Sequence, residues 1–240
     1  MVESIKKLRE ICQKPVIHLN TWYARNFARR ISIYFTWLCI LLRIKATPIS
    51  LFMLFTGILG SFFFSFGTYS HYVLAVILLQ FWYIFDHVDG ELARYWKESD
   101  AKGIFLDKLD HHIVHPLIFL FLGIGLWKQF NDPLMLILGG FIAYLLLLQD
   151  LINIDKRDSL FLTKIIKSKK ELKQKPNIFG LLFTKISAFV YKIPGLMNII
   201  TIAAVFNLIY YAFLFYAITF PMMILIKIVY NLNIPDNKFK

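Results

Sequence analysis

The chain has 240 residues, of which 58% are hydrophobic, with a net charge of +12 at pH 7 and a mean hydropathy of +0.60. This hydrophobic share is too high for an ordinary soluble domain, so the composition indicates a single-domain integral membrane protein. A nucleic-acid partner is disfavoured because the basic residues cluster beside apolar segments, which favours an anionic membrane face or a phosphate-rich substrate. Cys12 and Cys39 match no metal or redox spacing.

The N-terminal residues lack the apolar core and the small-residue cleavage site of a signal peptide, so we expect the membrane segments to remain in the mature protein. From Thr21 to Arg43, Arg25, Arg29 and Arg30 alternate with apolar residues. Arginines on one side and apolar residues on the other predict an amphipathic helix in the membrane interface, and residues 1–46 form an N-terminal interfacial segment. A seventh span is the alternative, disfavoured by the charged first half.

Residues 47–240 are predicted to form an all-α integral membrane domain with six transmembrane helices, because six segments approach the ~20 apolar residues that a span needs. The last stretch is long enough for two helices joined by a turn near Tyr210–Phe213. The predicted spans are Thr47–Gly67, His71–Tyr95, Ile104–Trp127, Pro133–Ile154 and the two halves of Ile193–Asn231.

Basic residues are distributed unevenly between the two sides of these spans. Nine Lys and Arg precede the first span and ten lie between Asp155 and Lys192, whereas the opposite connections hold one, Lys128. The positive-inside rule therefore predicts cytoplasmic termini, and we expect a bacterial inner, cytoplasmic membrane. Lys164–Lys175 is expected to be a solvated cytoplasmic face, with contact to anionic lipid as the alternative.

Four aspartates lie where the second predicted span ends and the third begins. Asp86 and Asp89 are three residues apart, which places them on one face of a helix, and Asp107 and Asp110 repeat that step. Because the connection Tyr95–Lys102 is short, the two helices are predicted to be antiparallel neighbours with facing carboxylate pairs.

Four carboxylates at membrane depth need neutralisation, and only Arg94 and Lys108 lie nearby in the sequence. Two divalent cations would balance the charge, and oxygen ligands favour Mg²⁺ or Mn²⁺. Two metals held by carboxylates are typical of phosphoryl transfer. The small residues Gly90, Ala93 and Gly103 leave room for a ligand, and Arg94 suits a phosphate.

Three other interpretations of these carboxylates remain open. They are helix-end carboxylates with packing glycines, a cation or proton transporter, and a scaffold without chemistry. A transporter is disfavoured because no internal repeat is evident.

The spacing resembles the complete signature of the CDP-alcohol phosphotransferase (CDP-alcohol phosphatidyltransferase) family. It reads Asp86-x2-Asp89-Gly90-x2-Ala93-Arg94-x8-Gly103-x3-Asp107-x3-Asp110. The resemblance implies that a CDP-alcohol, commonly CDP-diacylglycerol, transfers its substituted phosphoryl group to a hydroxyl acceptor in phospholipid biosynthesis, with release of CMP. It also implies a homodimer.

The resemblance assigns roles to the signature residues. It implies that Asp86, Asp89 and Asp107 are metal ligands, and that Asp110 approaches the metals and acts as the general base. The residues implied to bind the cytidine diphosphate are Asp89, Gly90, Ala93, Arg94 and Gly103.

The acceptor is less well defined by sequence. The N-terminal part resembles the branch that makes inositol phosphate or glycerol phosphate lipids, and a glycan or unusual polyol acceptor is the alternative. Thr47-Pro48 is followed by Ile49, where many relatives have Asn, so any contact of that Asn is in doubt.

Histidines follow the last aspartate at a helical spacing. His111 and His115 are candidates for acceptor binding, with an extra metal site or polar packing as alternatives, and His112 has no assigned role. Lys185 and Lys192 are candidates to hold an acceptor phosphate, with a simple anchoring role at the membrane as the alternative.

Overall fold

The computed structural model describes residues 3–98, 101–166, 190–191 and 194–232, and side chains are described for all of these except 155–166 and 230–232. Every regular element in the described residues is helical, which confirms the all-α prediction. Short helical turns at Arg9–Gln13, Lys14–Leu19, Ala24–Ala28 and Phe64–Phe66 accompany the main helices. These are α1 (Ile5–Leu8), α2 (Arg29–Leu41), α3 (Ala46–Phe63), α4 (Tyr69–Trp96), α5 (Ala101–Phe130), α6 (Leu134–Ile166), α8 (Gly195–Val205) and α9 (Ile209–Leu232).

Five of the described helices are long and apolar enough to cross a membrane. They correspond to the first four predicted spans and to the last one. The remaining predicted span corresponds to α8, whose 11 residues reach only about 16 Å at 1.5 Å per residue. The candidate spans are Ala46–Phe66, Tyr69–Trp96, Ala101–Phe130, Leu134–Ile154 and Ile209–Val229.

The turn between the last two helices lies earlier than predicted. Helix α8 ends at Val205 and α9 begins at Ile209, so the prediction of a turn at Tyr210–Phe213 was wrong. Asn207 adopts a left-handed conformation (φ 57°), and the Leu208 N–H donates to the Ala203 carbonyl. Hydropathy did not locate this turn because it lies among apolar residues that do not interrupt the run.

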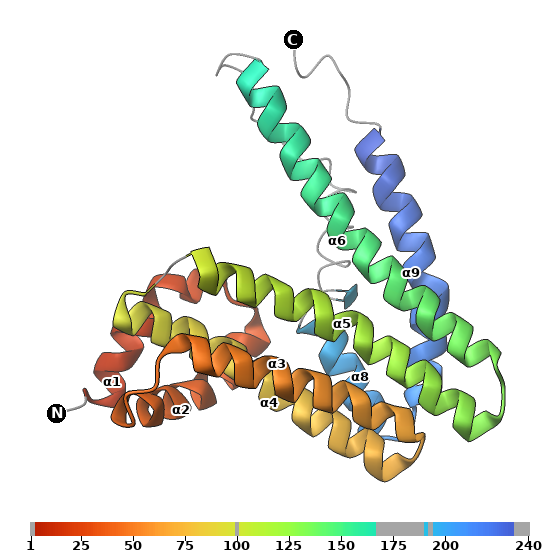
Figure 1. The fold of residues 1–240 in the computed structure, drawn as a ribbon, viewed down its shortest axis with the longest axis horizontal. Coiled ribbons are helices and arrows are strands. Elements are labelled where there is room, and N and C mark those ends of the chain that lie inside the picture. The colour runs from red at the N-terminus through yellow and green to blue at the C-terminus, as the bar shows by residue number, and fades with distance from the viewer. Residues whose placement is uncertain (1–2, 99–100, 167–189, 192–193, 233–240) are drawn as a thin grey trace.

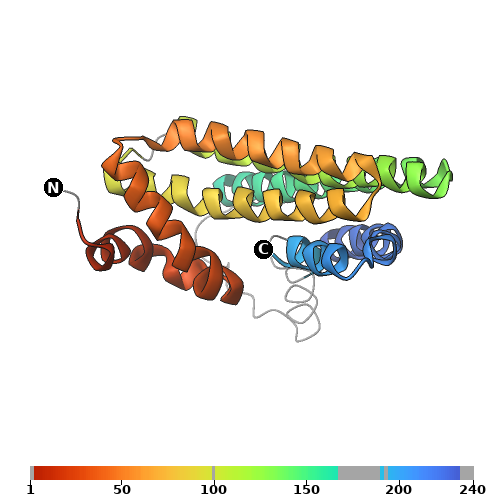
Figure 2. The ribbon, with the colours of Figure 1, turned by 90° about the horizontal axis from the view of Figure 1, so that it is seen from below.

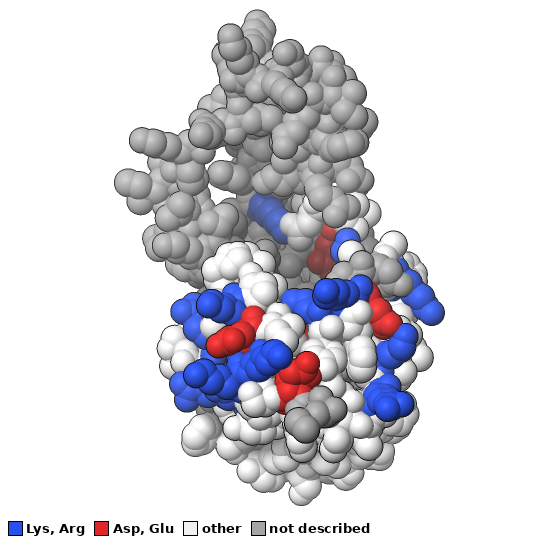
Figure 3. All heavy atoms as spheres, turned by 90° about the vertical axis from the view of Figure 1, so that its left-hand side faces the viewer, with Lys and Arg blue, Asp and Glu red and all other residues white. Residues whose placement is uncertain are grey.

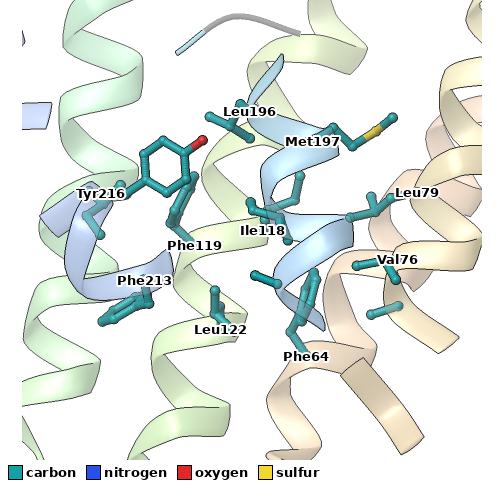
Figure 4. Close-up of a cluster of buried hydrophobic side chains, with 14 of the residues drawn as sticks. Phe64, Val76, Leu79, Ile118, Phe119, Leu122, Leu196, Met197, Phe213 and Tyr216 are labelled. Atoms are coloured by element: carbon teal, nitrogen blue, oxygen red, sulfur yellow. The ribbon is translucent and has the colours of Figure 1, made fainter. Parts of the chain in front are cut away.

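Helices α4 and α5 both pack against α3, and α6 and α9 lie beyond α5 (Figures 1 and 2). Helix α8 packs against α4, so the C-terminal half returns to the first helices. The core between them is apolar and contains Phe119, Leu196 and Phe213 from three different helices (Figure 4). This packing holds α4 and α5, which carry the aspartates, in a fixed relation.

The N-terminal segment lies against one end of α4 (Figure 2). Within it, the prediction that Arg25, Arg29 and Arg30 share one outward side was wrong for Arg29, which is buried, whereas the other two are exposed. Periodicity could not reveal this burial because the partner of Arg29 is distant in sequence. The exposed apolar side chains of α2 are Tyr34, Trp37, Leu38 and Leu41.

Helices α5 and α6 approach closely through two glycines. A Cβ at Gly139 would lie 2.7 Å from the Phe119 carbonyl oxygen and 2.9 Å from Cα of Gly123. A Cβ at the neighbouring Gly140 would meet nothing within 4 Å. The crossing therefore requires glycine at one position and tolerates a larger residue at the next.

We expect Gly139→Ala to lower the unfolding temperature in detergent by several degrees, because backbone atoms cannot move aside and overpacking costs about 1–3 kcal/mol. Gly140→Ala is the matched control and should be neutral or slightly stabilising, since alanine favours a helix. Equal melting temperatures for the two variants would contradict the close crossing of α5 and α6.

Candidate functional site

A cavity of about 670 Å³ opens beside the ends of α3, α4 and α5. Its walls hold most of the predicted signature residues together with the first turn of α3. Thus the structure gathers residues that are up to 60 positions apart in sequence. The lining includes Thr47, Ser50, Asp86, Asp89, Gly90, Ala93, Arg94, Gly103 and Asp107.

Asp86 and Asp107 face each other across α4 and α5, with His111 between them. Nε2 of His111 lies 3.4 Å from Oδ1 of Asp86 and 3.7 Å from Oδ1 of Asp107. One ligand atom from each of the three residues falls within 4.8 Å of the others. Two carboxylates and one imidazole therefore form a group able to hold a divalent cation.

Asp89 and Asp110 lie outside that group of three. Asp89 is buried and accepts a hydrogen bond from Oγ of Ser50 at 3.1 Å. Asp110 is only 1% exposed, and its Oδ2 accepts from Nε1 of Trp82 at 2.7 Å. Its Oδ1 is buried without a hydrogen-bond partner among the described residues. One oxygen of Asp110 is thus fixed in orientation while the other remains able to accept a proton.

Two backbone features, a carbonyl of the N-terminal segment and a glycine of α4, position the Arg94 side chain. Its Nε donates to the Cys12 carbonyl at 2.5 Å. A Cβ at Gly90 would lie 3.3 Å from Nη1 of Arg94, so the absence of a side chain there lets the guanidinium lie along α4. A planar guanidinium held beside the carboxylates suits a phosphate oxygen.

The N-terminal segment is fastened to α4 by the carboxylate of Glu91, which is fully buried. Oε1 pairs with Nη1 of Arg29 at 3.1 Å, which forms a buried ion pair. Such a charge is tolerated because it is paired and fully hydrogen bonded. The remaining donors are Nε2 of Gln13 at 2.9 Å and Oγ of Ser32 at 2.7 Å, both to Oε1, and Oγ1 of Thr36 at 2.6 Å to Oε2.

The pKa of the Cys12 thiol reflects the same contact between the N-terminal segment and α4. Burial, with a smaller contribution from the nearby Glu91 carboxylate, raises its pKa to about 11. The docked segment therefore keeps this thiol protonated at the mildly alkaline pH at which an ordinary cysteine begins to ionise.

A second cavity of about 430 Å³ also has Asp86 in its wall. His111, His112 and His115 of α5 line it, and Nδ1 of His112 lies 2.9 Å from Oδ2 of Asp150 on α6. His115 packs edge-on against the Trp82 ring. Lys185 and Lys192, the other acceptor-site candidates, lie outside the described residues.

Positive charge surrounds the end of the molecule that carries the N-terminal segment. Figure 3 shows lysines and arginines over much of this face, with acidic side chains between them. Arg9, Lys14, Arg25 and Arg30 line a surface cavity of about 300 Å³ on this segment. This face suits anionic surroundings.

Several residues of this end were not predicted from sequence. Glu91 and Asp150 could have been identified from the sequence as residues with a partner or a function, because burying an ionisable group in an apolar segment otherwise costs free energy. Trp82 gave no signal, because an indole in a span is ordinary.

Removal of the Glu91 carboxylate should detach the N-terminal segment. Glu91→Ala leaves Arg29 buried without its partner, which typically costs about 3–5 kcal/mol. In a Cys39→Ala background, we expect Cys12 to react with a maleimide at pH 8 far faster in Glu91→Ala than in the parent, because release lowers the thiol pKa toward its ordinary value and exposes it.

Glu98→Ala is the control for that experiment. Glu98 pairs with Lys45, and the two side chains are 39% and 63% exposed, so the loss should be at most about 1 kcal/mol. Slow labelling of Cys12 in Glu91→Ala would show that the segment is held by other contacts.

The sequence matches the profile of CDP-alcohol phosphatidyltransferase over residues 35–229, which covers more than half of the chain. A search among curated proteins finds no match. The matched region contains both helices of the aspartate cluster and, among the described helices that follow, α6, α8 and most of α9. The chain therefore belongs to the CDP-alcohol phosphatidyltransferase family and is an enzyme that transfers substituted phosphate groups.

Proposed function

We propose that the protein transfers the phosphatidyl group of CDP-diacylglycerol to a hydroxyl of a polar alcohol, with release of CMP. Family membership supports the reaction class. The observation that carries the proposal further is the 670 Å³ cavity. Its wall contains both the cationic Arg94 and clustered carboxylates, and it lies at the end of apolar helices. Such a position allows a lipid tail in the membrane and a polar nucleotide in the cavity.

The donor nucleotide would lie against Gly90, Ala93, Arg94 and Gly103. In this arrangement Arg94 pairs with the diphosphate, and the small residues permit close approach of the ligand. Asp89, held by Ser50, completes this wall of the cavity.

Mg²⁺ or Mn²⁺ fits the donor set. Asp86 and Asp107 with His111 supply ligand atoms within 4.8 Å of each other, and Oδ1 of Asp110 is a buried oxygen without a partner. Asp89 is the fourth carboxylate and completes the ligand set we assign to two ions. When bound, the metal would neutralise the diphosphate and stabilise charge on the attacking and leaving oxygens.

Asp110 is the residue we assign as the general base. The acceptor hydroxyl oxygen forms a bond to the phosphorus that bears the diacylglycerol, and the bond from that phosphorus to the CMP oxygen breaks. CMP leaves with the electron pair, and the hydroxyl proton passes to Oδ1 of Asp110. Trp82 holds Oδ2, which fixes the orientation of the base.

Placement in the membrane follows from charge and exposure. We propose cytoplasmic termini and a cytoplasmic active site in a bacterial inner membrane, supported by the positive face in Figure 3. The exposed Trp22, Tyr34 and Trp37 support an interfacial position for residues 1–46, ahead of a membrane domain at 47–240. The family resemblance supports a homodimer.

Asp110→Asn should reduce CMP release from CDP-diacylglycerol by about 10²–10⁴-fold, the usual contribution of a general base. Part of the CDP binding, measured by thermal stabilisation, should persist because Asp110 does not line the first cavity and the other three carboxylates remain. Asp132→Asn is the control, since Asp132 is partly exposed and caps the Leu134 N–H far from the site. Near-normal turnover in Asp110→Asn would rule out Asp110 as the general base. Absence of CMP release from any CDP-alcohol by the folded parent would overturn the proposed transferase activity.

Asp107→Asn should weaken metal binding directly. We expect Mn²⁺ to raise the melting temperature of the parent in detergent, to have no effect after excess EDTA, and to have a smaller effect in this variant. An unchanged Mn²⁺ shift in Asp107→Asn would exclude Asp107 as a ligand, and Asp132→Asn again serves as the control.

A further inference from the structure

The second cavity adjoins the first at a shared carboxylate. Asp86 lines both cavities, and His111, which contacts Asp86, lines only the second. If the nucleotide occupies the first cavity, as the proposed function requires, its diphosphate lies near Asp86. A molecule in the second cavity would then lie beside the same carboxylate as the diphosphate.

The walls of this cavity carry an unusual set of polar groups. Four histidines line it: His87 on α4 and His111, His112 and His115 on α5. His87 is only 9% exposed, and its Nε2 is buried without a hydrogen-bond partner among the described residues. A buried polar atom without a partner costs about 1–3 kcal/mol, so a ligand that supplied one would bind favourably.

The His112–Asp150 pair supplies a directed contact. With Nδ1 of His112 bound to Oδ2 of Asp150 at 2.9 Å, the ring is fixed in orientation and Nε2 has no bond within the described residues. A hydroxyl group suits Nε2 in either protonation state, because it donates and accepts.

The charge of the lining argues against a phosphorylated acceptor. Among the described lining residues Lys108 is the one fixed cation, opposed by Asp86 and Asp150, and no arginine is present. Phosphate is typically bound by arginine clusters. The cationic surface cavity at Arg9, Arg25 and Arg30 shows that the chain does build such clusters elsewhere.

An amino alcohol is also disfavoured. A quaternary or primary ammonium needs a free carboxylate or an aromatic cage. His111 and His87 lie beside the two oxygens of Asp86, and His112 holds one oxygen of Asp150. Tyr83 is the one tyrosine in the described lining and is almost fully buried, so no aromatic cage is formed by these residues.

We propose that this second cavity binds an uncharged polyhydroxyl acceptor, a free polyol or the sugar end of a glycan, through the His112–Asp150 pair and Nε2 of His87. The cavity of about 430 Å³ is within the usual size of small-molecule sites. Of the acceptor classes expected from sequence, the polyol or glycan class is therefore preferred over inositol phosphate or glycerol phosphate.

The test is an acceptor panel with the full chain in detergent, CDP-diacylglycerol and Mg²⁺. Inositol and glycerol are compared with inositol 1-phosphate and glycerol 3-phosphate, and with ethanolamine. We expect an uncharged polyol to stimulate CMP release at least tenfold more at equal concentration than its phosphorylated form. Higher rates with a phosphorylated acceptor or with ethanolamine would overturn the proposal while leaving the proposed function intact.

Asp150→Asn and His112→Gln give the residue-level test. Each should raise the KM for the preferred polyol about tenfold while the KM for CDP-diacylglycerol stays within twofold, because the pair lines only the second cavity. His71→Gln is the matched control, since His71 pairs with Thr68 at the far end of α4.

The outcomes separate the two proposals. An unchanged polyol KM in both variants would overturn the assignment of this cavity, and a parallel rise in the donor KM would show a general structural effect instead. Absence of CMP release with every donor and acceptor would overturn the proposed function, and this assignment with it.

Discussion

The buried carboxylate of Glu91 is the contact on which the polar end of this protein depends. It lies on α4 between the predicted nucleotide-binding residues Gly90 and Ala93, yet its side chain turns toward the N-terminal segment. In the ion pair with Arg29, each of the two buried charges compensates the other, and either charge alone would be costly to bury. The same helix turn thus presents one face to the first cavity and another to the N-terminal segment.

Docking of that segment shapes both cavities. The Cys12 carbonyl accepts from Arg94, which lines the first cavity, and Asn20 and Thr21 line the second. If the segment moved away, the second cavity would lose the part of its wall that Asn20 and Thr21 form, and Arg94 would lose its bond to the Cys12 carbonyl. This explains why buried polar bonds hold the segment that precedes the membrane spans. Apolar contacts alone lack direction, whereas a carboxylate with four hydrogen-bond donors fixes both the position and the angle of the segment.

Sequence predicted the features that depend on local pattern. The four aspartates, their two helices and the five long apolar helices follow from spacing and hydropathy, which act over a few turns. The burial of Arg29, the turn at Asn207 and the bonds of Asp110 to Trp82 and of Asp150 to His112 depend on contacts between distant elements. Periodicity carries no information about such partners, although an ionisable residue within an apolar segment, such as Asp150, does indicate that one exists.

Asp86 lies where the two proposed substrate sites meet. Asp86 is the carboxylate that both cavities share, and His111 joins it to Asp107 across the two helices. Because lipid surrounds the apolar surfaces of the spans, polar ligands can enter only where the helices end, and both must enter at the same end. The proposed donor wall has small residues and one arginine, whereas the proposed acceptor wall has imidazoles, and this difference in chemistry would keep each ligand on its own side. Apart from the shared Asp86, the histidines and Asp150 of the proposed acceptor wall lie outside the family signature, so we expect that acceptor choice can change without disturbing the proposed nucleotide site.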